Sequence, residues 1–506
     1  FKTKAKPAES VKLVWEGIRN RLSLWPIGAD VNNALISRDG NTLVVVANVA
    51  GQSNLYTYSL DELSREPAVL KQLTSTPGFK SNVQLSGDGK EVWYLENGRI
   101  QAISLDTKVP RSVTTTAEMD VDFNKEKLEV FREAWDVQNK GYYDPNFHGA
   151  NWKEVYNIYE PLAAGANTPD ELRRLLSLMV GELNSSHSGI SGPTPPSYTL
   201  GRTGLLFDRA AYENGGRLKI NEVIYLGPAD IAEGIKVGDY LKAIDGVTIN
   251  KNTNIDQLLD NKVNRKVALT ITDGNGGNEH VANIRPVNEP TEKGLLYKQW
   301  VQQQRDYVAK VSGGRLGYVH MYDMSAESLN QLYLDMDAEN RAREGVVVDI
   351  RNNNGGFVNA YALDVLARKG YMTMTVRGLP SAPARTQLGQ RALEAPTVLV
   401  TNRHSLSDAE DFTEGYRTLQ LGKVVGEPTG GWIIYTSSAT LIDGTTIRLP
   451  FIKITDHEGK DMELNPRPVD VFVSKPLTED NNGKDAQLDA AVKVLLEQLG
   501  VRKGTK

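Results

Sequence analysis

The C-terminal part of the sequence alternates between short apolar runs and helix-like stretches, and this alternation limits the possible folds more than any other feature. The apolar runs lie within "RLGYVHM", "GVVVDIR", "PTVLVTN" and "GKVVGEP", between residues 315 and 428. Runs of this length are typical of buried strands, and strands that alternate with helices predict an α/β fold with a partly parallel sheet. We therefore expect an α/β core over residues 291–506, closed by an amphipathic helix at residues 486–499.

Length and composition indicate a multidomain globular protein. A chain of 506 residues is too long for one core, and 40% of its residues are hydrophobic, which is enough for globular packing. The net charge of −5 argues against an electrostatic grip on nucleic acid. No apolar run approaches the ~20 residues of a membrane span. The lack of cysteine excludes a thiol nucleophile, a disulfide framework and a thiolate zinc site.

Residues 1–115 contain a weak repeat. "ALISRDGNTLVVVA" (34–47) is echoed by "VQLSGDGKEVWYLE" (83–96), each with two predicted strands around an Asp-Gly turn. The offset of 49 residues between Asp39 and Asp88 suits a four-stranded propeller blade. Two blades cannot close a propeller, which needs about four to eight. Either the chain is the tail of a longer protein, which is the interpretation that we favour, or these blades pack on another part of the protein.

Residues 120–193 have a helical pattern. "KLEVFREAWDVQNKGYY" spaces its apolar residues three and four apart, and "TPDELRRLLSLMVGEL" begins with Thr168 as N-cap and Pro169 at the first helical position. This second helix runs into "NSSHSG", residues 184–189. The pattern predicts a helical cap that ends in a Ser-His pair.

Residues 194–290 follow a proline cluster and are rich in short predicted strands. "GLLF" is followed by "GIKVGDYLKAIDGVTI" (234–249), whose Asp-Gly turn predicts a hairpin. The segment resembles a PDZ domain. That resemblance implies that the "GLLF" loop binds the terminal carboxylate of a peptide through backbone N–H groups, next to an exposed strand edge. The loop consists of Gly204, Leu205, Leu206 and Phe207.

Two polar turns follow predicted strands of the core. "DIRNNNGG" (349–356) has two glycines, which let backbone N–H groups face a ligand, and "TNRHSLSDAEDF" (401–412) places Ser407 between a strand and a helix-like stretch. Catalytic groups in α/β folds tend to lie at the carboxyl ends of strands, so Ser407 is a candidate nucleophile. Because Glu410 follows three residues later, the same serine is also a candidate N-cap in a capping box, and the two roles are compatible.

The order of these motifs resembles that of the tricorn protease branch of the carboxyl-terminal processing protease family. A helical segment ending in Ser-His, a PDZ domain, "DIRNNNGG", "SLSDAE" and a glutamate before "NPRPVD" follow one another between about residues 120 and 473. The resemblance implies a serine peptidase with Ser407 as nucleophile. It also implies an oxyanion hole made by the N–H of Asp408 and that of either Gly355 or Gly356. Tricorn-type proteins carry propellers upstream, which agrees with the N-terminal repeat.

The family offers two kinds of base for Ser407. Processing proteases use a lysine 25 residues after the serine, where this sequence has Trp432, which cannot accept a proton. Tricorn-type members use a histidine oriented by the preceding serine and by a glutamate, and Ser186, His187 and Glu463 stand in those places. A serine needs a base, and the base needs an orienting group. Because the reference pKa of histidine is about 6.5, we expect activity to fall as the pH drops through roughly 6 to 7.

His187 has a structural alternative, because a histidine at a helix end is favoured by the helix dipole. The other histidines are weaker candidates, and His404, which precedes the serine turn, is expected to line the cleft or meet solvent. None recurs at metal-ligand spacing, so we predict no metal and no cofactor. The histidines concerned are His148, His280, His320, His404 and His457.

The sequence therefore predicts a multidomain α/β protein that acts as a serine endopeptidase or oligopeptidase. It would hydrolyse unfolded polypeptides or peptides through an acyl-enzyme at a site between domains, with the PDZ segment assisting substrate binding. An inactive PDZ-type peptide-binding scaffold and a lipid carrier with a dry apolar cleft are the alternatives. The charge and the lack of a long apolar run predict no nucleic-acid partner and no membrane span. The resemblance leaves the oligomeric state open, with a homo-oligomer as one possibility, and it suggests a cytoplasmic location, with the cell envelope as the alternative.

Overall fold

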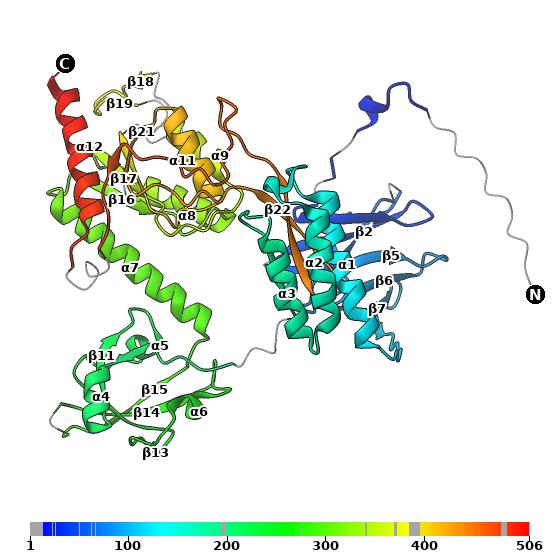
Figure 1. Cartoon of the computed structure of the whole chain (residues 1–506), viewed down its shortest axis with the longest axis horizontal. Helices are drawn as coiled ribbons and strands as arrows, with labels where there is room; N and C mark the ends of the chain where they lie inside the picture. Colours follow the sequence, from blue (N-terminus) through cyan, green and yellow to red (C-terminus); the bar gives the residue numbers. More distant parts are fainter. Residues whose placement is uncertain are drawn as a thin grey trace, which may run out of the picture. The chain divides into compact units, whose positions relative to one another are not determined.

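The computed structural model describes residues 14–504, apart from positions 23, 26, 50, 62, 66, 194–198, 275, 340–341, 369–371, 384–394 and 477–482. The start of the predicted PDZ segment, residue 194, lies outside the described residues. The chain divides into two compact units, Phe1–Val121 and Asp122–Lys506 (Figure 1). None of the helices in the described part is both long and apolar enough to cross a membrane.

The first unit contains two four-stranded antiparallel sheets, as the sequence repeat predicts. The first sheet runs β1 (Asp30–Ile36), β2 (Thr42–Val49), β3 (Gln52–Ser59) and β4 (Lys71–Gln72), and a short helix η1 (Ile18–Arg21) precedes it. The second sheet runs β5 (Lys80–Leu85), β6 (Glu91–Glu96), β7 (Arg99–Ser104) and β8 (Pro110–Ser112).

The two sheets repeat the same turn and share one core. The Ser37 hydroxyl donates to Asp39 at 2.5 Å, and the Ser86 hydroxyl donates to Asp88 at 2.6 Å, so each Asp-Gly turn is closed in the same way. Buried side chains from both sheets pack into a common cluster, which includes Val44, Leu55, Val92 and Ile103. Each sheet thus buries one face against the other.

The second unit begins with three helices, α1 (Phe123–Gly141), α2 (Trp152–Gly165) and α3 (Pro169–Gly181). The Thr168 side chain accepts the Glu171 N–H at the start of α3, which confirms the predicted cap. A three-stranded sheet of β22 (Tyr435–Thr440), β23 (Thr446–Ile452) and β9 (Gly189–Ser191) packs against these helices (Figure 1). Its Leu441 and Ile447 belong to the helical core. The helical segment is therefore completed by a hairpin from far along the chain.

The strands that follow form a six-stranded sheet with the PDZ-like pattern. Its order is β10 (Leu205–Phe207), β11 (Leu218–Val223), β12 (Tyr240–Ile244), β14 (Val267–Thr272) and β15 (His280–Ile284), with β13 (Val247–Thr248) paired to β12. Short helices α4 (Arg209–Gly215), α5 (Pro228–Ile231) and α6 (Ile255–Leu259) accompany it. Residues Asp245 and Gly246 turn between β12 and β13, as predicted, and Gly246 has the positive φ of 82° that favours glycine there.

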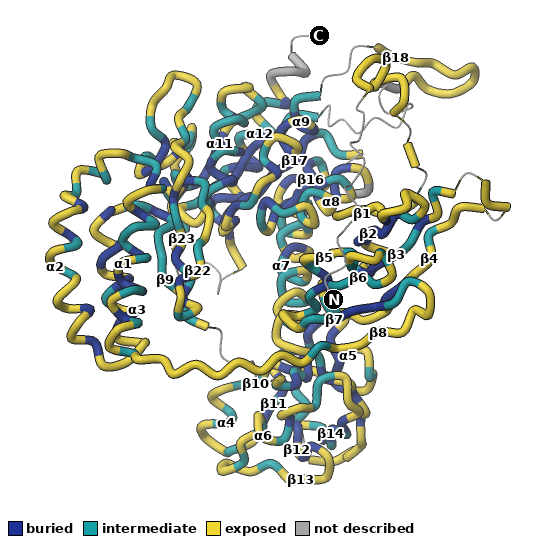
Figure 2. Tube along the Cα trace, turned by 90° about the vertical axis from the view of Figure 1, so that its right-hand side faces the viewer, coloured by how far each residue is buried: buried dark blue, intermediate teal, exposed yellow. Residues whose placement is uncertain are grey.

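The core of the second unit is a five-stranded sheet in which every pairing is parallel. Its order is β16 (Leu316–His320), β17 (Gly345–Asp349), β20 (Thr397–Thr401), β21 (Gly422–Gly426) and β24 (Val471–Phe472). All residues of β16, β17 and β20 are buried, as expected for parallel strands that are covered on both faces (Figure 2).

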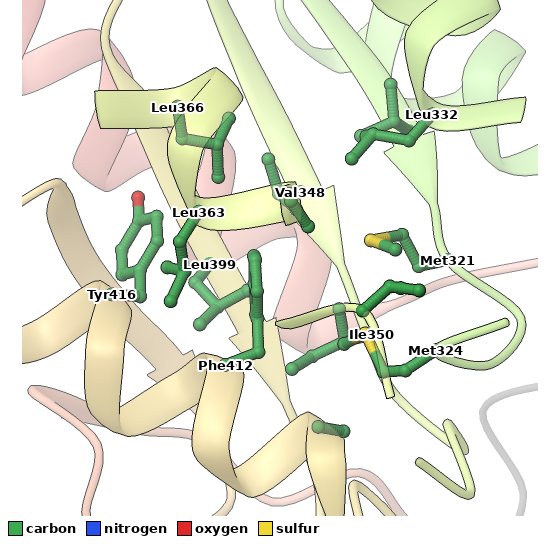
Figure 3. Packing of buried hydrophobic residues seen from close by; sticks show 14 of the residues in the cluster. Met321, Met324, Leu332, Val348, Ile350, Leu363, Leu366, Leu399, Phe412 and Tyr416 are labelled. Atoms are coloured by element: carbon green, nitrogen blue, oxygen red, sulfur yellow. The ribbon is translucent and has the colours of Figure 1, made fainter. Parts of the chain in front are cut away.

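Helices cover the two faces of this sheet. On one face α8 (Ala326–Leu334), α9 (Asn359–Ala367) and α11 (Asp408–Thr418) pack around Val348 and Leu399 (Figure 3). On the other face α7 (Glu289–Val311) and α12 (Ala486–Gly504) pack around Val347. Neighbouring residues of one strand thus enter different clusters, because side chains alternate along a strand. The minor elements are η2 (Phe147–Gly149), η3 (Asp335–Glu339), β18 (Thr373–Met374) and β19 (Ala382–Pro383).

Candidate active site

Ser407 lies at the junction of a strand and a helix in an unusual backbone conformation. The serine turn (residues 402–407) leads from β20 into α11, and Ser407 itself has φ 55° and ψ −125°. Residues other than glycine rarely adopt positive φ, and such outliers cluster at functional sites. The Ser407 side chain makes no cap hydrogen bond. The serine half of the predicted capping box is therefore absent, whereas the Glu410 carboxylate does accept a hydrogen bond from the Ser407 N–H.

The serine turn is tied to the glycine loop (residues 349–356) that follows the neighbouring strand β17. The Leu406 N–H donates to Asn353 O at 2.8 Å, and the Ser405 hydroxyl donates to Ile350 O, also at 2.8 Å. Ser405 and Asn353 are fully buried. Because β17 and β20 are parallel neighbours, the two turns leave the sheet at the same edge and hold each other in place.

The backbone N–H groups of the glycine loop and of the start of α11 differ in whether they have a hydrogen-bond partner. The Gly355 N–H is used, because it donates to Asn353 Oδ1 at 2.8 Å. In the described part of the chain, the N–H groups of Gly356 and Asp408 make no hydrogen bond. A Cβ on Gly355 would lie 2.6 Å from Ser407 Cβ, so the loop approaches the serine too closely for a side chain. Of the two glycines that the sequence left open, the hydrogen bonds favour Gly356.

Asp408 contributes its side chain to the packing of this region. Its fully buried carboxylate accepts the Asn359 N–H at 3.0 Å and so holds the start of α9 against the start of α11. Burial raises the pKa of Asp408. The Asp408 carboxylate therefore has a structural role, whereas the Asp408 N–H faces the serine turn from the first position of α11.

Ser186, His187 and Glu463 form one hydrogen-bonded chain. Ser186 Oγ lies 2.8 Å from His187 Nδ1 and 3.0 Å from Glu463 Oε2, and the Ser186 N–H donates to Glu463 Oε1 at 2.7 Å. Since an ionised carboxylate only accepts, the Ser186 hydroxyl donates to Glu463 and accepts from His187 Nδ1–H. The other ring nitrogen, Nε2, then carries the free lone pair. The structure thus brings together three predicted site residues from distant parts of the chain.

His187 is half-buried and has a positive φ of 61°. Burial, together with the nearby Arg448 guanidinium, lowers the pKa of His187 to about 4. The imidazole is therefore neutral at neutral pH. The expected loss of activity between pH 6 and 7 assumed an unshifted histidine, and the lowered pKa moves that expectation to more acidic conditions.

Aromatic side chains support the relay turn (residues 184–188) that carries His187. His148 Nδ1 donates to Asn184 O at 3.3 Å, and the Tyr143 hydroxyl donates to His148 Nε2. Both ring nitrogens of His148 are thus engaged in hydrogen bonds within the protein. His148 is accordingly a supporting residue, and it was not recognisable from its sequence spacing.

One peptide group links the relay to the serine turn. The carbonyl of Trp432 accepts the Ser407 N–H at 2.7 Å, and the N–H of Ile433, in the same peptide group, donates to Glu463 Oε2 at 3.1 Å. Among the described residues, no hydrogen bond joins Ser407 Oγ to His187. Catalytic hydrogen bonds are often long before substrate binds. The Trp432–Ile433 peptide group therefore provides the connection between the two halves of the site.

The buried Glu410 carboxylate holds the two peptide groups that directly precede the Trp432–Ile433 group. It accepts the N–H of Gly431 at 2.7 Å, the N–H of Trp432 at 2.6 Å and the hydroxyl of Thr429 at 2.5 Å. Burial raises the pKa of Glu410. Sequence reasoning missed this role, as it missed that of Asn353, although Asn353 stands in a motif that it singled out.

The predicted peptide-binding loop lies at the edge strand β10 of the PDZ-like sheet. Gly204 has a positive φ of 75°, and Leu206 is partly exposed. The Glu292 carboxylate of α7 accepts the Gly204 N–H and lies 3.8 Å from Arg202. One amide of the loop is therefore already used within the protein. In the described part of the chain, the loop shares no hydrogen bond with Ser407 or His187.

The described residues contain no group of three or more histidine, cysteine or acidic side chains that could hold a metal ion. His404 lies on the exposed side of the serine turn. His320 is buried, and its nitrogens bind the Tyr297 hydroxyl at 2.9 Å and the Arg351 carbonyl at 3.1 Å.

Comparisons with known proteins agree with this architecture. The model of peptidase family S41 matches residues 315–470, that of the tricorn protease C1 domain matches residues 123–181, and that of the tricorn protease PDZ domain matches residues 231–289. The chain therefore belongs to peptidase family S41, in its tricorn-type branch, as predicted.

Relatives and solved structures point to the same branch. The chain is 29% identical over 96% of its length to tricorn protease homolog 1 of Streptomyces coelicolor. It is 30% identical over 75% of its length to the tricorn protease homolog of Saccharolobus solfataricus. It spans only 47% and 35% of these two relatives. A crystal structure of the tricorn protease shares the fold, with a TM-score of 0.80 over 93% of this chain and 46% of that one, at 23% identity.

Proposed function

We propose that the chain carries the catalytic centre of a serine peptidase, with Ser407 as nucleophile, His187 as base, and Ser186 and Glu463 as its orienting groups. The observation that carries the proposal is the hydrogen-bonded chain from Glu463 through Ser186 to His187 Nδ1. It fixes the tautomer in which Nε2 can accept a proton. A base oriented by a third group is what a serine nucleophile needs.

The proposed reaction uses these groups in turn. Ser407 Oγ attacks the substrate carbonyl, and His187 Nε2 takes its proton. The oxyanion receives hydrogen bonds from the N–H groups of Gly356 and Asp408, and such donors stabilise it by about 3 kcal/mol each. His187 then protonates the leaving amine, which leaves an acyl-enzyme on Ser407. A water molecule, deprotonated by the same imidazole, releases the acid product.

The substrate class follows from the family and from the PDZ-like sheet. Unfolded polypeptides or peptides suit a dock made of an exposed strand and backbone donors, here Gly204, Leu205, Leu206 and Phe207. A substrate carboxylate would compete with Glu292 for the Gly204 N–H. The four predicted segments, 1–115, 120–193, 194–290 and 291–506, would then supply propeller blades, base, dock and nucleophile.

The protein is further proposed to work within a larger assembly. It is 27% identical to a relative from Sulfurisphaera tokodaii that is described as a putative tricorn-like protease C-terminal subunit, and it spans 58% of that relative. Light scattering of the purified chain tests for a homo-oligomer, and a single monomeric species at micromolar concentration would contradict it.

The proposed chemistry is tested with fluorogenic peptides and a serine-reactive phosphonate. The wild type should hydrolyse peptides and take up one label, whereas Ser407→Ala should lose on the order of 10³-fold or more in turnover and take up none. Ser438→Ala, at an exposed position of β22, is the matched control and should behave as wild type. Near-normal turnover by Ser407→Ala would overturn the assignment. Peptide binding by the wild type without turnover or labelling would instead support the inactive scaffold.

A further inference from the structure

A cavity of about 450 Å³ opens beside the serine turn, and the chain itself does not fill it. Its apolar lining comes from three parts of the sequence, namely the serine turn, the segment after β21, and the segment around β24. The lining includes Leu406, Pro428, Trp432, Pro466 and Phe472. Ligand pockets span roughly 300–1,000 Å³, so this one suits a side chain and its flanking backbone better than a folded partner.

Two large apolar side chains of this lining remain exposed to solvent. Trp432 is 50% exposed and Phe472 is 66% exposed. Exposed aromatic side chains gathered around a hollow mark a place where a ligand can cover them. The charged groups at the rim compensate each other, because Arg403 lies 3.3 Å from Glu427. The lining therefore favours an uncharged, apolar occupant.

The cavity is continuous with the proposed catalytic turn. Leu406 directly precedes Ser407, and the backbone of Trp432 accepts the Ser407 N–H at 2.7 Å. Leu406 is itself fixed by its N–H bond to Asn353 O at 2.8 Å. The wall of the cavity thus has a fixed position relative to the nucleophile. A substrate held at Ser407 in extended form projects side chains to alternate sides, so one residue near the cleaved bond can reach the cavity.

We propose that this cavity is a subsite for one bulky apolar side chain, aromatic or leucine-like, of a substrate residue that flanks the cleaved bond. The inference rests on the proposed peptidase function and names the substrates that this function prefers. The side chains of Trp432 and Phe472 are the specificity-determining groups. They take no part in the proposed proton transfers, which involve Ser407 and His187, and the hydrogen bond that position 432 makes to Ser407 uses its backbone carbonyl.

The first test is a peptide series in which each residue flanking the cleaved bond is Phe, Leu, Ala, Asp or Lys. The wild type should favour Phe or Leu over Ala at one flanking position by about tenfold or more in kcat/KM. Phe472→Ala should reduce this preference to about twofold. Phe451→Ala removes a comparably exposed aromatic side chain outside the cavity and should keep the preference.

The second test separates the subsite from the chemistry. Fluorescence anisotropy measures binding of labelled Phe and Ala peptides to the Ser407→Ala protein, which retains the cavity. The Phe peptide should bind about tenfold more tightly, and the double variant Ser407→Ala/Phe472→Ala should lose the difference. Equal binding of both peptides, or a preference that survives Phe472→Ala, would overturn the subsite. Turnover by Ser407→Ala would overturn the proposed function and leave this binding test intact.

Discussion

The two halves of the proposed catalytic centre are built in different ways. The nucleophile half joins the serine turn to the glycine loop, which leave neighbouring parallel strands at the same edge of one sheet. The base half places His187 on a turn whose Ser186 binds Glu463, 277 positions further along the sequence. The nucleophile half therefore forms where two adjacent strands of the sheet end. The base half forms only when segments that are far apart in the sequence come together. We expect the base half to be the more vulnerable to substitutions outside the reacting residues.

The largest expected effect tests the base half and concerns His187. His187→Ala should lower kcat on the order of 10³-fold or more, since no neighbouring described side chain is placed to accept the serine proton. Steady-state kinetics on a fluorogenic peptide measure the loss. Lys423→Ala is the control, because Lys423 is exposed and pairs with Asp470 at 3.4 Å. Full activity in His187→Ala, or a loss confined to Lys423→Ala, would assign the base to a different residue.

The next largest effect tests the long-range support of the base half. Glu463→Gln places an amide where the carboxylate accepts two N–H donors and one hydroxyl, those of Ser186 and Ile433. We expect a loss in kcat on the order of 10²-fold with little change in KM, because the imidazole keeps its place but loses its orientation and its charge partner. Ser186→Ala should also lose less than His187→Ala, because Ser186 orients the imidazole and does not carry the proton. A loss in either variant as large as that of His187→Ala would contradict an orienting role.

A smaller effect tests the local support of the nucleophile half. Asn353→Ala frees the Gly355 N–H and removes the bond that shapes the glycine loop. We expect roughly a tenfold loss in kcat with KM unchanged, because the Gly356 donor shifts relative to the developing oxyanion. Asn353→Asp keeps the acceptor for Gly355 and should recover part of the activity. An increased KM with unchanged kcat in Asn353→Ala would place the effect on substrate binding instead.

The smallest effect concerns pH. Since the pKa of His187 is lowered to about 4, the base stays neutral above that value, and activity should fall only as the pH drops through about 4. The folded protein should also lose stability as the pH falls from about 6.5 toward 4, because the unfolded histidine binds a proton more tightly over that range. Arg448→Gln removes one cause of the lowered His187 pKa. It should move the acidic limb of the pH–activity profile to higher pH, by less than about one pH unit.

A second carboxyl group close to Ser407 requires a control in that profile. Burial raises the pKa of Asp411 to about 7, and Asp411 accepts the Tyr435 hydroxyl at 3.0 Å. A fall in activity near pH 7 that disappears in Asp411→Asn would come from the titration of Asp411. A limb near pH 6.5 that persists in Asp411→Asn would contradict a buried, neutral His187.

The fold was predictable where the signal is local. Short apolar runs between helical stretches indicate the parallel sheet, and the Asp39 and Asp88 turns indicate two similar sheets, because strand burial and turn chemistry depend on neighbouring residues. The hairpin of β22 and β23 that completes the helical core was not predictable. Strand β23 of this hairpin pairs with β9, which is distant in sequence, and the residues of neither strand indicate which segment it pairs with.

The candidate site shows the same limit. The resemblance to tricorn-type proteins supplied Ser186, His187 and Glu463 together, which no spacing rule would have done. It did not choose between Gly355 and Gly356, because both are glycines and only the bond from Gly355 N–H to Asn353 distinguishes them. The lowered pKa of His187 was equally out of reach, since it depends on which segments bury the ring.

The Trp432–Ile433 peptide group has a consequence for how such an enzyme can diversify. Both of its hydrogen bonds use main-chain atoms, so neither depends on the side chain at position 432. Substitutions other than proline at position 432 keep these bonds, whereas proline at position 432 or 433 would remove an N–H that donates to Glu410 or to Glu463. Position 432 can therefore tolerate substitution while its side chain, which lines the cavity, affects substrate preference. A saturation library at position 432 would therefore test which substrate preferences can arise from changes in this one side chain.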